Sequence, residues 1–330
     1  MTLPWPTAAA TGVGSLPGTD PAEAIRIALG EAPELPFLPE LPQRGPHADI
    51  AGRTGALLAD LFVDLQPSGW RITARPSRDG RRARDLLSRD LDALEETEAR
   101  PALLKLQAAG PWTLAATLEL SRGDRVLADP GAVKDLAASL AEGLTSHLAD
   151  VRRRLPGTTL LLQLDEPALP GVMAAQIPTA SGFGRLRAPD RQTVVEQLRV
   201  VLSAGDHTVV HCCAPRPPVA VFRDAGAGSV SVDAAMLAPQ DDDDLGAAIE
   251  NGAGLLLGLV PGTDADLSDL AARMEPAKAL WRRLGFAPDR MPEAVVVTPS
   301  CGLAGASPSY ARHALAACVE MARRLGEEPE

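Results

Sequence analysis

The chain has 330 residues, a net charge of −11 and a mean hydropathy of zero. Its 45% of hydrophobic residues is enough for a large core and argues against global disorder. No apolar run approaches the roughly 18 residues of a membrane span, and the N-terminus has no signal-peptide pattern, so we expect a cytoplasmic protein. The acidic balance argues against nucleic-acid binding, which requires clustered Lys and Arg.

Short apolar runs bounded by Gly, Pro or Asp recur along the chain and predict strands. Most of the runs are continuous, which is typical of strands buried on both faces of a parallel sheet. The predicted strands cover residues 10–15, 35–39, 103–107, 159–165, 208–213, 229–233, 255–260 and 294–298.

Stretches with a 3.6-residue period separate these runs and predict helices. The predicted helices include residues 21–29, 50–65, 132–154, 190–204, 267–284 and 308–325.

The alternation of eight strands with helices predicts a (β/α)8 TIM barrel. The extended stretch WRITARP indicates a small hairpin excursion near residues 69–76. No linker or internal repeat divides the chain, so we expect residues 1–330 to form one domain. An open α/β sheet remains the alternative, because strands are counted here from one sequence.

Polar and thiol side chains gather at the predicted C-terminal ends of these strands, where such barrels carry their catalytic groups. The strand-end residues are Gly14, Ser15, Asp165, Glu166, His211, Cys212, Cys213, Asp233 and, just past the last strand, Cys301.

A metal site is one interpretation of this set. His211 and Cys213 are two residues apart on a strand, so they face the same side, whereas Cys212 faces away and packs behind the sheet. Asp233 and Cys301 follow other strands, and imidazole, thiolate and carboxylate groups together are typical zinc ligands. The alternative for HxC alone is an ordinary buried strand end; Cys301 favours the metal.

Two other features have simpler interpretations. The acidic run Asp241–Asp244 lacks the alternating spacing of a calcium loop and indicates a solvated loop leading into a helix N-terminus. Cys318 lies among Ala, Leu and Met at helical core spacing, which predicts a small buried side chain.

Five motifs, VGSLPGT, LQLDEPAL, VVHCC, SVSVDAA and VTPSCGL, resemble in order and spacing those of cobalamin-independent methionine synthase. The resemblance is to the catalytic barrel in its short single-domain form, within the wider fold group that includes uroporphyrinogen decarboxylase. It extends from about Thr11 to Arg324. It implies a zinc-dependent methyltransferase that methylates the thiol of homocysteine, or of a similar small thiol, and so gives methionine.

The resemblance also implies roles for individual residues. His211, Cys213 and Cys301 match the family's zinc ligands, and Asp233 stands where the family has a glutamate ligand. Asp165, the implied catalytic residue, matches the aspartate that binds the amino group of the substrate. The implied substrate-binding set is Gly14, Ser15, Asp165 and Glu166.

Two departures from the family concern the methyl donor and proton transfer. The family's histidine after the seventh strand is missing from GLVPGTD, and Thr117 replaces the tryptophan that stacks on folate. Trp112 lies nearby but is expected to fill a gap between barrel and helix. The donor therefore stays open between a methyltetrahydrofolate and a corrinoid. A zinc- or thiol-binding homologue without turnover and a uroporphyrinogen decarboxylase-like enzyme remain alternatives.

Overall fold

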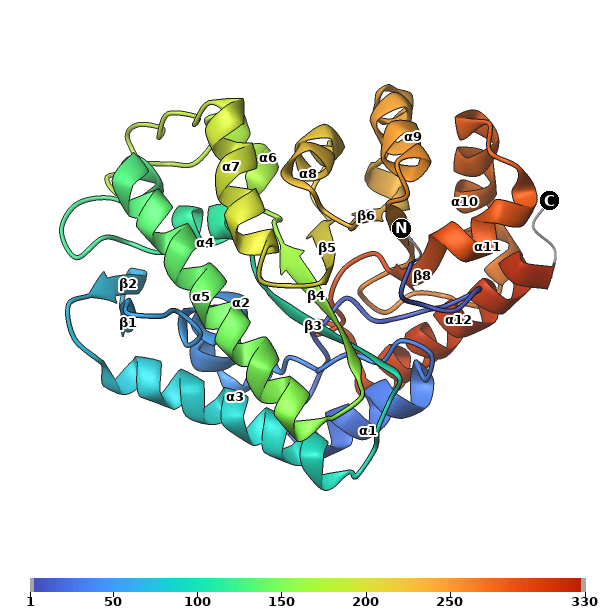
Figure 1. Ribbon diagram of the computed structural model, residues 1–330, viewed down its shortest axis with the longest axis horizontal. Coiled ribbons are helices and arrows are strands. Elements are labelled where there is room, and N and C mark those ends of the chain that lie inside the picture. Colours follow the sequence, from blue (N-terminus) through green and yellow to red (C-terminus); the bar gives the residue numbers. More distant parts are fainter. Residues whose placement is uncertain (1–2, 328–330) are drawn as a thin grey trace.

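The computed structural model describes residues 3–327 (Figure 1). Its strands are β1 Phe62–Gln66, β2 Gly69–Thr73, β3 Leu103–Ala109, β4 Thr159–Asp165, β5 His207–Cys212, β6 Ser229–Asp233, β7 Gly254–Val260 and β8 Val295–Pro299. Its α-helices are α1 Pro21–Glu31, α2 Ile50–Gly55, α3 Arg78–Glu96, α4 Pro111–Thr117, α5 Pro130–Arg154, α6 Leu169–Met173, α7 Arg191–Leu202, α8 Val219–Ala225, α9 Asp242–Glu250, α10 Leu270–Leu284, α11 Met291–Ala294 and α12 Pro308–Glu327.

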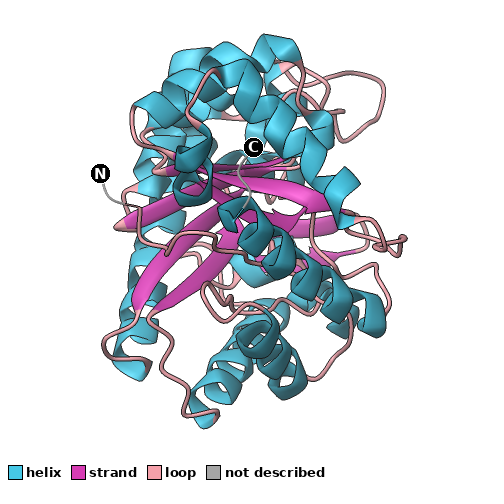
Figure 2. Ribbon diagram, turned by 90° about the vertical axis from the view of Figure 1, so that its right-hand side faces the viewer, coloured by secondary structure: helices cyan, strands magenta, loops and turns pink. Residues whose placement is uncertain are grey.

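A parallel sheet of six strands, in the order β3-β4-β5-β6-β7-β8, forms the centre of the molecule. Its strands are buried almost throughout, as the continuous apolar runs predicted. Figure 2 shows these strands inside a surround of helices. The molecule therefore has an α/β fold with a half-barrel of parallel strands, consistent with a TIM-like barrel.

Two extended N-terminal segments, residues 9–16 and 35–40, lie along the edges of this sheet. The first pairs with β8, where Thr11 N donates to Val297 O at 3.1 Å, and the second pairs with β3, where Leu38 N donates to Lys105 O at 2.9 Å. The two segments are joined to each other by a parallel bridge between Ser15 and Glu40. They occupy the places of the first two predicted strands, although each makes isolated bridges only.

The interior of the sheet is layered. The layer nearest the N-terminal ends of the strands is a small apolar cluster. It draws on Trp5, on both N-terminal segments and on five strands: Trp5, Ala9, Leu35, Leu103, Leu161, Val209, Leu256 and Val296. The next residues on the same faces are polar, such as Lys105, Gln163 and His211, all buried. The outer faces pack against the helices in a much larger apolar core.

One helix prediction is wrong in its second half. The stretch predicted as a helix over 50–65 is helical only to Gly55, and Asp60 then takes a left-handed φ of 56°. A helix cannot continue through that conformation. The chain forms β1 instead, which pairs antiparallel with β2 from Phe62 to Gln66. The predicted hairpin is therefore confirmed but begins earlier, and Figure 1 places it away from the parallel sheet.

Other local predictions are confirmed. The acidic run lies at a helix N-terminus as predicted, where the helix dipole favours negative charge. Three of its four aspartates form the first turn of α9 and not a loop before it. Cys318 is fully buried in the outer core. Within residues 3–327, no helix has the length and apolar character needed to cross a membrane.

Candidate metal and substrate site

A cavity of about 280 Å³ opens at the C-terminal ends of the strands. The two N-terminal segments, β4, β5 and the loop after β8 all contribute to its wall. Most of the residues predicted from the sequence line it together: Gly14, Ser15, Asp165, His211, Cys213 and Cys301.

Three side chains form a cluster that could hold a metal ion. The ligand atoms of His211, Cys213 and Cys301 all lie within 4.8 Å of one another. The two sulfur atoms are 3.4 Å apart, although the residues are 88 positions apart in the chain. Alternation along β5 turns Cys212 to the other side, where it is fully buried in the apolar core. The predicted division between Cys213 and Cys212 is thus confirmed.

The imidazole ring of His211 is oriented as a metal ligand would be. Its Nδ1 lies 2.8 Å from Ser231 Oγ on β6. A proton on Nδ1, donated to that hydroxyl, leaves the Nε2 lone pair free, and Nε2 is buried without a hydrogen-bond partner. An orphaned buried nitrogen is costly unless something binds it. A soft divalent metal such as zinc, facing this nitrogen and two sulfurs, satisfies the set.

The two thiols also influence each other's protonation. The hydrogen bond from Cys213 lowers the pKa of Cys301, and His211 lowers it further. The same hydrogen bond raises the pKa of Cys213, and burial adds to this effect. One sulfur is therefore readily a thiolate, which is the form that ligates metal. By contrast, burial raises the pKa of Cys212 to about 12, which makes it an inert thiol.

Asp233 lies at the edge of this cluster. Its carboxylate is not among the atoms grouped within 4.8 Å, and its Oδ1 accepts a hydrogen bond from Ala235 N at 2.9 Å. Burial raises the pKa of Asp233; the charge of Cys301 also raises it, and the charge of His211 lowers it. Asp233 lines a second cavity, of about 710 Å³, between the ends of β6 and β7 and helix α10.

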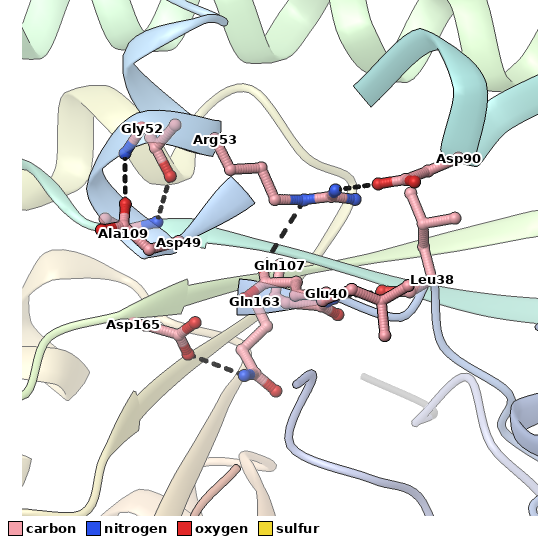
Figure 3. Close-up of polar contacts among 12 residues, drawn as sticks. Leu38, Glu40, Asp49, Gly52, Arg53, Asp90, Gln107, Ala109, Gln163 and Asp165 are labelled. Atoms are coloured by element: carbon pink, nitrogen blue, oxygen red, sulfur yellow. Dashed lines mark hydrogen bonds and ion pairs between the residues drawn. The ribbon is translucent and has the colours of Figure 1, made fainter. Parts of the chain in front are cut away.

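Three carboxyl groups line the smaller cavity, those of Glu40, Asp49 and Asp165. Asp165 accepts a hydrogen bond from Gln163 Nε2 at 2.7 Å, and burial raises its pKa (Figure 3). Glu40 lies at the end of the second N-terminal segment, and burial raises its pKa to about 7 against the opposing charge of Arg53. The Arg53 Nε and Glu40 Oε1 atoms are 3.8 Å apart.

Several residues of the site were missed by the sequence reasoning. Glu40 directly follows a predicted strand, so the strand-end rule that found Asp165 could have found it too. Ser231 is two residues before Asp233 on β6, and alternation could have placed it on the inner face. Asp49, which also lines the cavity, follows no predicted strand and had no such signal.

Glu166 has a different place from the one expected. Its carboxylate accepts hydrogen bonds from Trp112 N at 2.9 Å and from Thr113 N at 2.7 Å, at the start of α4. A third bond comes from Thr113 Oγ1, at 2.7 Å. Glu166 is fully buried and is not part of the cavity wall. It therefore caps a helix, and the substrate-binding role implied by the motif is corrected.

Glycines allow the first loop and the last loop to meet at the cavity. A Cβ on Gly302 would lie 2.1 Å from Ser15 Oγ, and a Cβ on Gly14 would lie 2.8 Å from Gln107 Cγ. Leu303 N donates to Ser15 O at 2.9 Å across this contact. The close approach holds Ser15 beside Cys301, in the wall that both share.

Trp112 has the structural role expected of it. It is buried, and its Nε1 donates to Val194 O at 3.1 Å on α7. No Phe, Trp or Tyr side chain of the described residues lines either the smaller or the larger cavity.

The comparison with protein families decides the assignment. The model of the family described as "Cobalamin-independent synthase, Catalytic domain" matches residues 5–324, nearly the whole chain. The chain belongs to this family. Its members are methyltransferases, and the motif resemblance seen in the sequence is thereby confirmed.

Solved structures agree with the family at the level of the fold. A B12-independent methionine synthase from Shewanella sp. W3-18-1, in complex with selenomethionine, superposes with a TM-score of 0.63 at 12% identity, covering 98% of this chain and 99% of that one. A putative vitamin-B12 independent methionine synthase from Listeria monocytogenes superposes with a TM-score of 0.60 at 15% identity, with the same coverage. No curated protein matches the chain.

Proposed function

We propose that this protein is a zinc-dependent S-methyltransferase that methylates homocysteine, or a similar small thiol, to give methionine. The observation that carries the proposal is one cavity that joins the His211, Cys213 and Cys301 cluster to the carboxyl groups of Glu40 and Asp165. A thiol-binding metal site and an ammonium-binding pair side by side fit the two ends of an amino-acid thiol.

His211 Nε2 and the sulfurs of Cys213 and Cys301 would hold the zinc. Zinc bound there would keep the substrate thiol deprotonated at neutral pH, where a free alkyl thiol, with a pKa near about 8.5, is mostly protonated. Asp233 is the proposed further ligand, through Oδ2, because its Oδ1 already accepts from Ala235. Ser231 holds the His211 ring in place through Nδ1.

The protein's own residues would orient the substrate. Glu40 and Asp165 are the two acidic side chains suited to bind its ammonium group, and the resulting charge pairs would stabilise both carboxylates in a buried place. The Gly14–Ser15 loop, through the Ser15 hydroxyl group, would bind the substrate carboxylate. Binding both the ammonium and the carboxylate group of the substrate would direct its thiol toward Cys213 and Cys301, which is an orientation effect.

The larger cavity is the proposed approach for the methyl donor, because Asp233 and Ser300, the neighbour of Cys301, lie in its wall. In the transfer, the substrate sulfur forms the new bond to the methyl carbon. The bond from that carbon to the donor breaks, and its electron pair leaves with the donor. The thiol proton is released to solvent.

We also propose that residues 1–330 form a single domain whose barrel is closed by the two N-terminal segments. The parallel bridges from Ala10 to Val297, from Ser15 to Glu40 and from Phe37 to Lys105 support a closed circle of eight. The apolar interior layer, which draws on both segments as well as on the sheet, supports it too.

Zinc analysis combined with a methyl-transfer assay tests the proposed function. We expect about one zinc per chain and methylation of homocysteine. Cys213→Ser and Cys301→Ser should each lose zinc and turnover, whereas the matched control Cys212→Ser should keep both, because its thiol packs in the outer core. Equal zinc content in all three variants would refute the site. Stoichiometric zinc without methyl transfer from any donor would favour the homologue without turnover.

A further inference from the structure

A buried lysine contacts one of the residues that line the substrate cavity. Lys105 is on the inner face of β3 and is fully buried, among the largest side chains to be so. Its Nζ donates to the carbonyl oxygen of Val13 at 2.7 Å and lies 3.4 Å from Gln107 Oε1. A buried ammonium group is expensive, and this one has no carboxylate within 4.0 Å among the described residues. The Phe37 ring lies 5.6 Å from Nζ, measured to the ring centroid, and burial lowers the pKa of Lys105 to about 8.

The Val13 carbonyl connects Lys105 to the walls of the cavity. The same oxygen accepts a second hydrogen bond, from Gln163 Nε2 at 2.9 Å. That amide also donates to Asp165 at 2.7 Å, a contact shown in Figure 3. Val13 is followed at once by Gly14 and Ser15. The Val13 carbonyl oxygen thus connects the Gly14–Ser15 loop to Asp165 through Gln163. The shorter of its two hydrogen bonds comes from Lys105.

Buried charges of both signs surround the cavity. The buried carboxyl groups are those of Glu40, Asp90, Asp165 and Glu166, and the buried cationic side chains are Arg53 and Lys105. Arg44 and Arg53 both pair with Asp90, and Arg53 also reaches Glu40. Lys105 belongs to none of these ion pairs. Its charge acts on both Asp165 and Glu40, and His211 also acts on Asp165.

We propose that Lys105 is a positioning residue that makes the cavity specific for the head group of an α-amino acid. Its ammonium group donates a hydrogen bond to the Val13 carbonyl oxygen. Through Val13 it fixes the position of the Gly14–Ser15 loop and of the hydrogen-bonded pair Gln163 and Asp165. Its charge also lowers the pKa of both Asp165 and Glu40, against the effect of burial. The inference rests on the proposed function, because it assumes an amino-acid thiol as substrate.

Calorimetric binding to the zinc-loaded protein tests this role with two thiols. L-Homocysteine carries the head group, and propane-1-thiol is the same chain without it. We expect Lys105→Met to reduce the preference for homocysteine over propane-1-thiol by about tenfold to a hundredfold, because buried polar groups would lose their partner. Zinc content should not change. A purely structural role would weaken both thiols equally.

Two further variants keep the test decisive. Lys105→Gln has no charge but retains an amide donor. If the Met variant does not fold, the preference for homocysteine over propane-1-thiol is measured on the Gln variant instead. Thr298→Val is the matched control, because Thr298 is a buried polar residue of β8 and should keep the preference. A preference unchanged within threefold in both Lys105 variants overturns the inference. A wild-type protein without any preference for homocysteine would instead contradict the proposed function.

Discussion

In the candidate site, the two-residue period of a strand decides which side chains face the cavity. His211 and Cys213 face the cavity, and Cys212 between them is part of the outer core. The same alternation puts Gln163 directly below Asp165 on β4, where the two hydrogen bond. A strand can thus present a reactive group and its supporting group with one apolar residue between them.

Glu40 should make the stability of the protein depend on pH. Its pKa is raised from 4.5 to about 7, mainly by burial. Between these values the folded state keeps a proton that the unfolded state has lost, so this contribution to stability is complete below pH 4.5 and falls as the pH rises to 7. Replacement by Gln, which is neutral at every pH, should remove the loss.

Denaturant unfolding of wild type and Glu40→Gln between pH 4.5 and 8 measures this effect. The two proteins should differ little near pH 4.5, and the variant should become the more stable by up to about 3 kcal/mol at pH 8. Parallel stability curves over the whole range would show that Glu40 is ionised in the folded state throughout.

At the scale of elements, the turn after β4 and the start of α4 are built as one unit. Glu166 satisfies two backbone N–H groups in the first turn of α4, a helix of seven residues with no capping side chain of its own at Gly110. Gly110 is required there, because a Cβ would lie 2.3 Å from Glu166 Oε1. The acidic motif therefore provides a cavity residue, Asp165, and a helix cap next to it.

Removal of this cap should destabilise the protein without emptying the metal site. Glu166→Ala leaves buried N–H groups unsatisfied, and we expect a loss of about 2–4 kcal/mol in the free energy of unfolding. The measurement is chemical denaturation, with metal analysis on the same samples. Glu250→Ala, which removes an exposed carboxylate at the end of α9, is the control and should change little. Loss of zinc at unchanged stability would instead place Glu166 in the site.

At the scale of the whole molecule, the arrangement of the two cavities bears on the methyl donor. The larger cavity lies next to the cysteine cluster and is walled mainly by aliphatic and acidic side chains. Trp112, the nearest substitute for the folate-stacking tryptophan, is instead packed against α7. A pterin ring would therefore lack a stacking platform, a loss comparable to the roughly 1–3 kcal/mol of base stacking on an aromatic side chain.

We therefore expect methyltetrahydrofolate to be a poor methyl donor. Methylcobalamin or a methyl-corrinoid protein should support faster methylation of homocysteine in a side-by-side assay of the zinc-loaded protein. Efficient, saturable turnover with micromolar methyltetrahydrofolate would contradict this prediction. It would mean that another group binds the pterin.

Much of the fold and part of the site could be predicted from the sequence because they depend on local spacing. Continuous apolar runs identified the six strands of the parallel sheet to within two residues at each end. The two-residue period separated Cys213 from Cys212, and the strand-end rule selected Asp165 and His211. Each of these inferences needs only neighbouring residues and the preference of apolar side chains for the core.

Only the tertiary structure decided what depends on residues far apart in the chain. The approach of Cys213 to Cys301, the meeting of Gly302 with Ser15 and the support of Val13 by Lys105 all arise from how strands and loops pack. The Glu166 carboxylate lies at the start of α4 and not in the cavity, because it accepts hydrogen bonds from N–H groups there that have no partner within the helix. Local sequence carries no information on such distances, since burial and hydrogen bonding are satisfied only once the whole chain has folded.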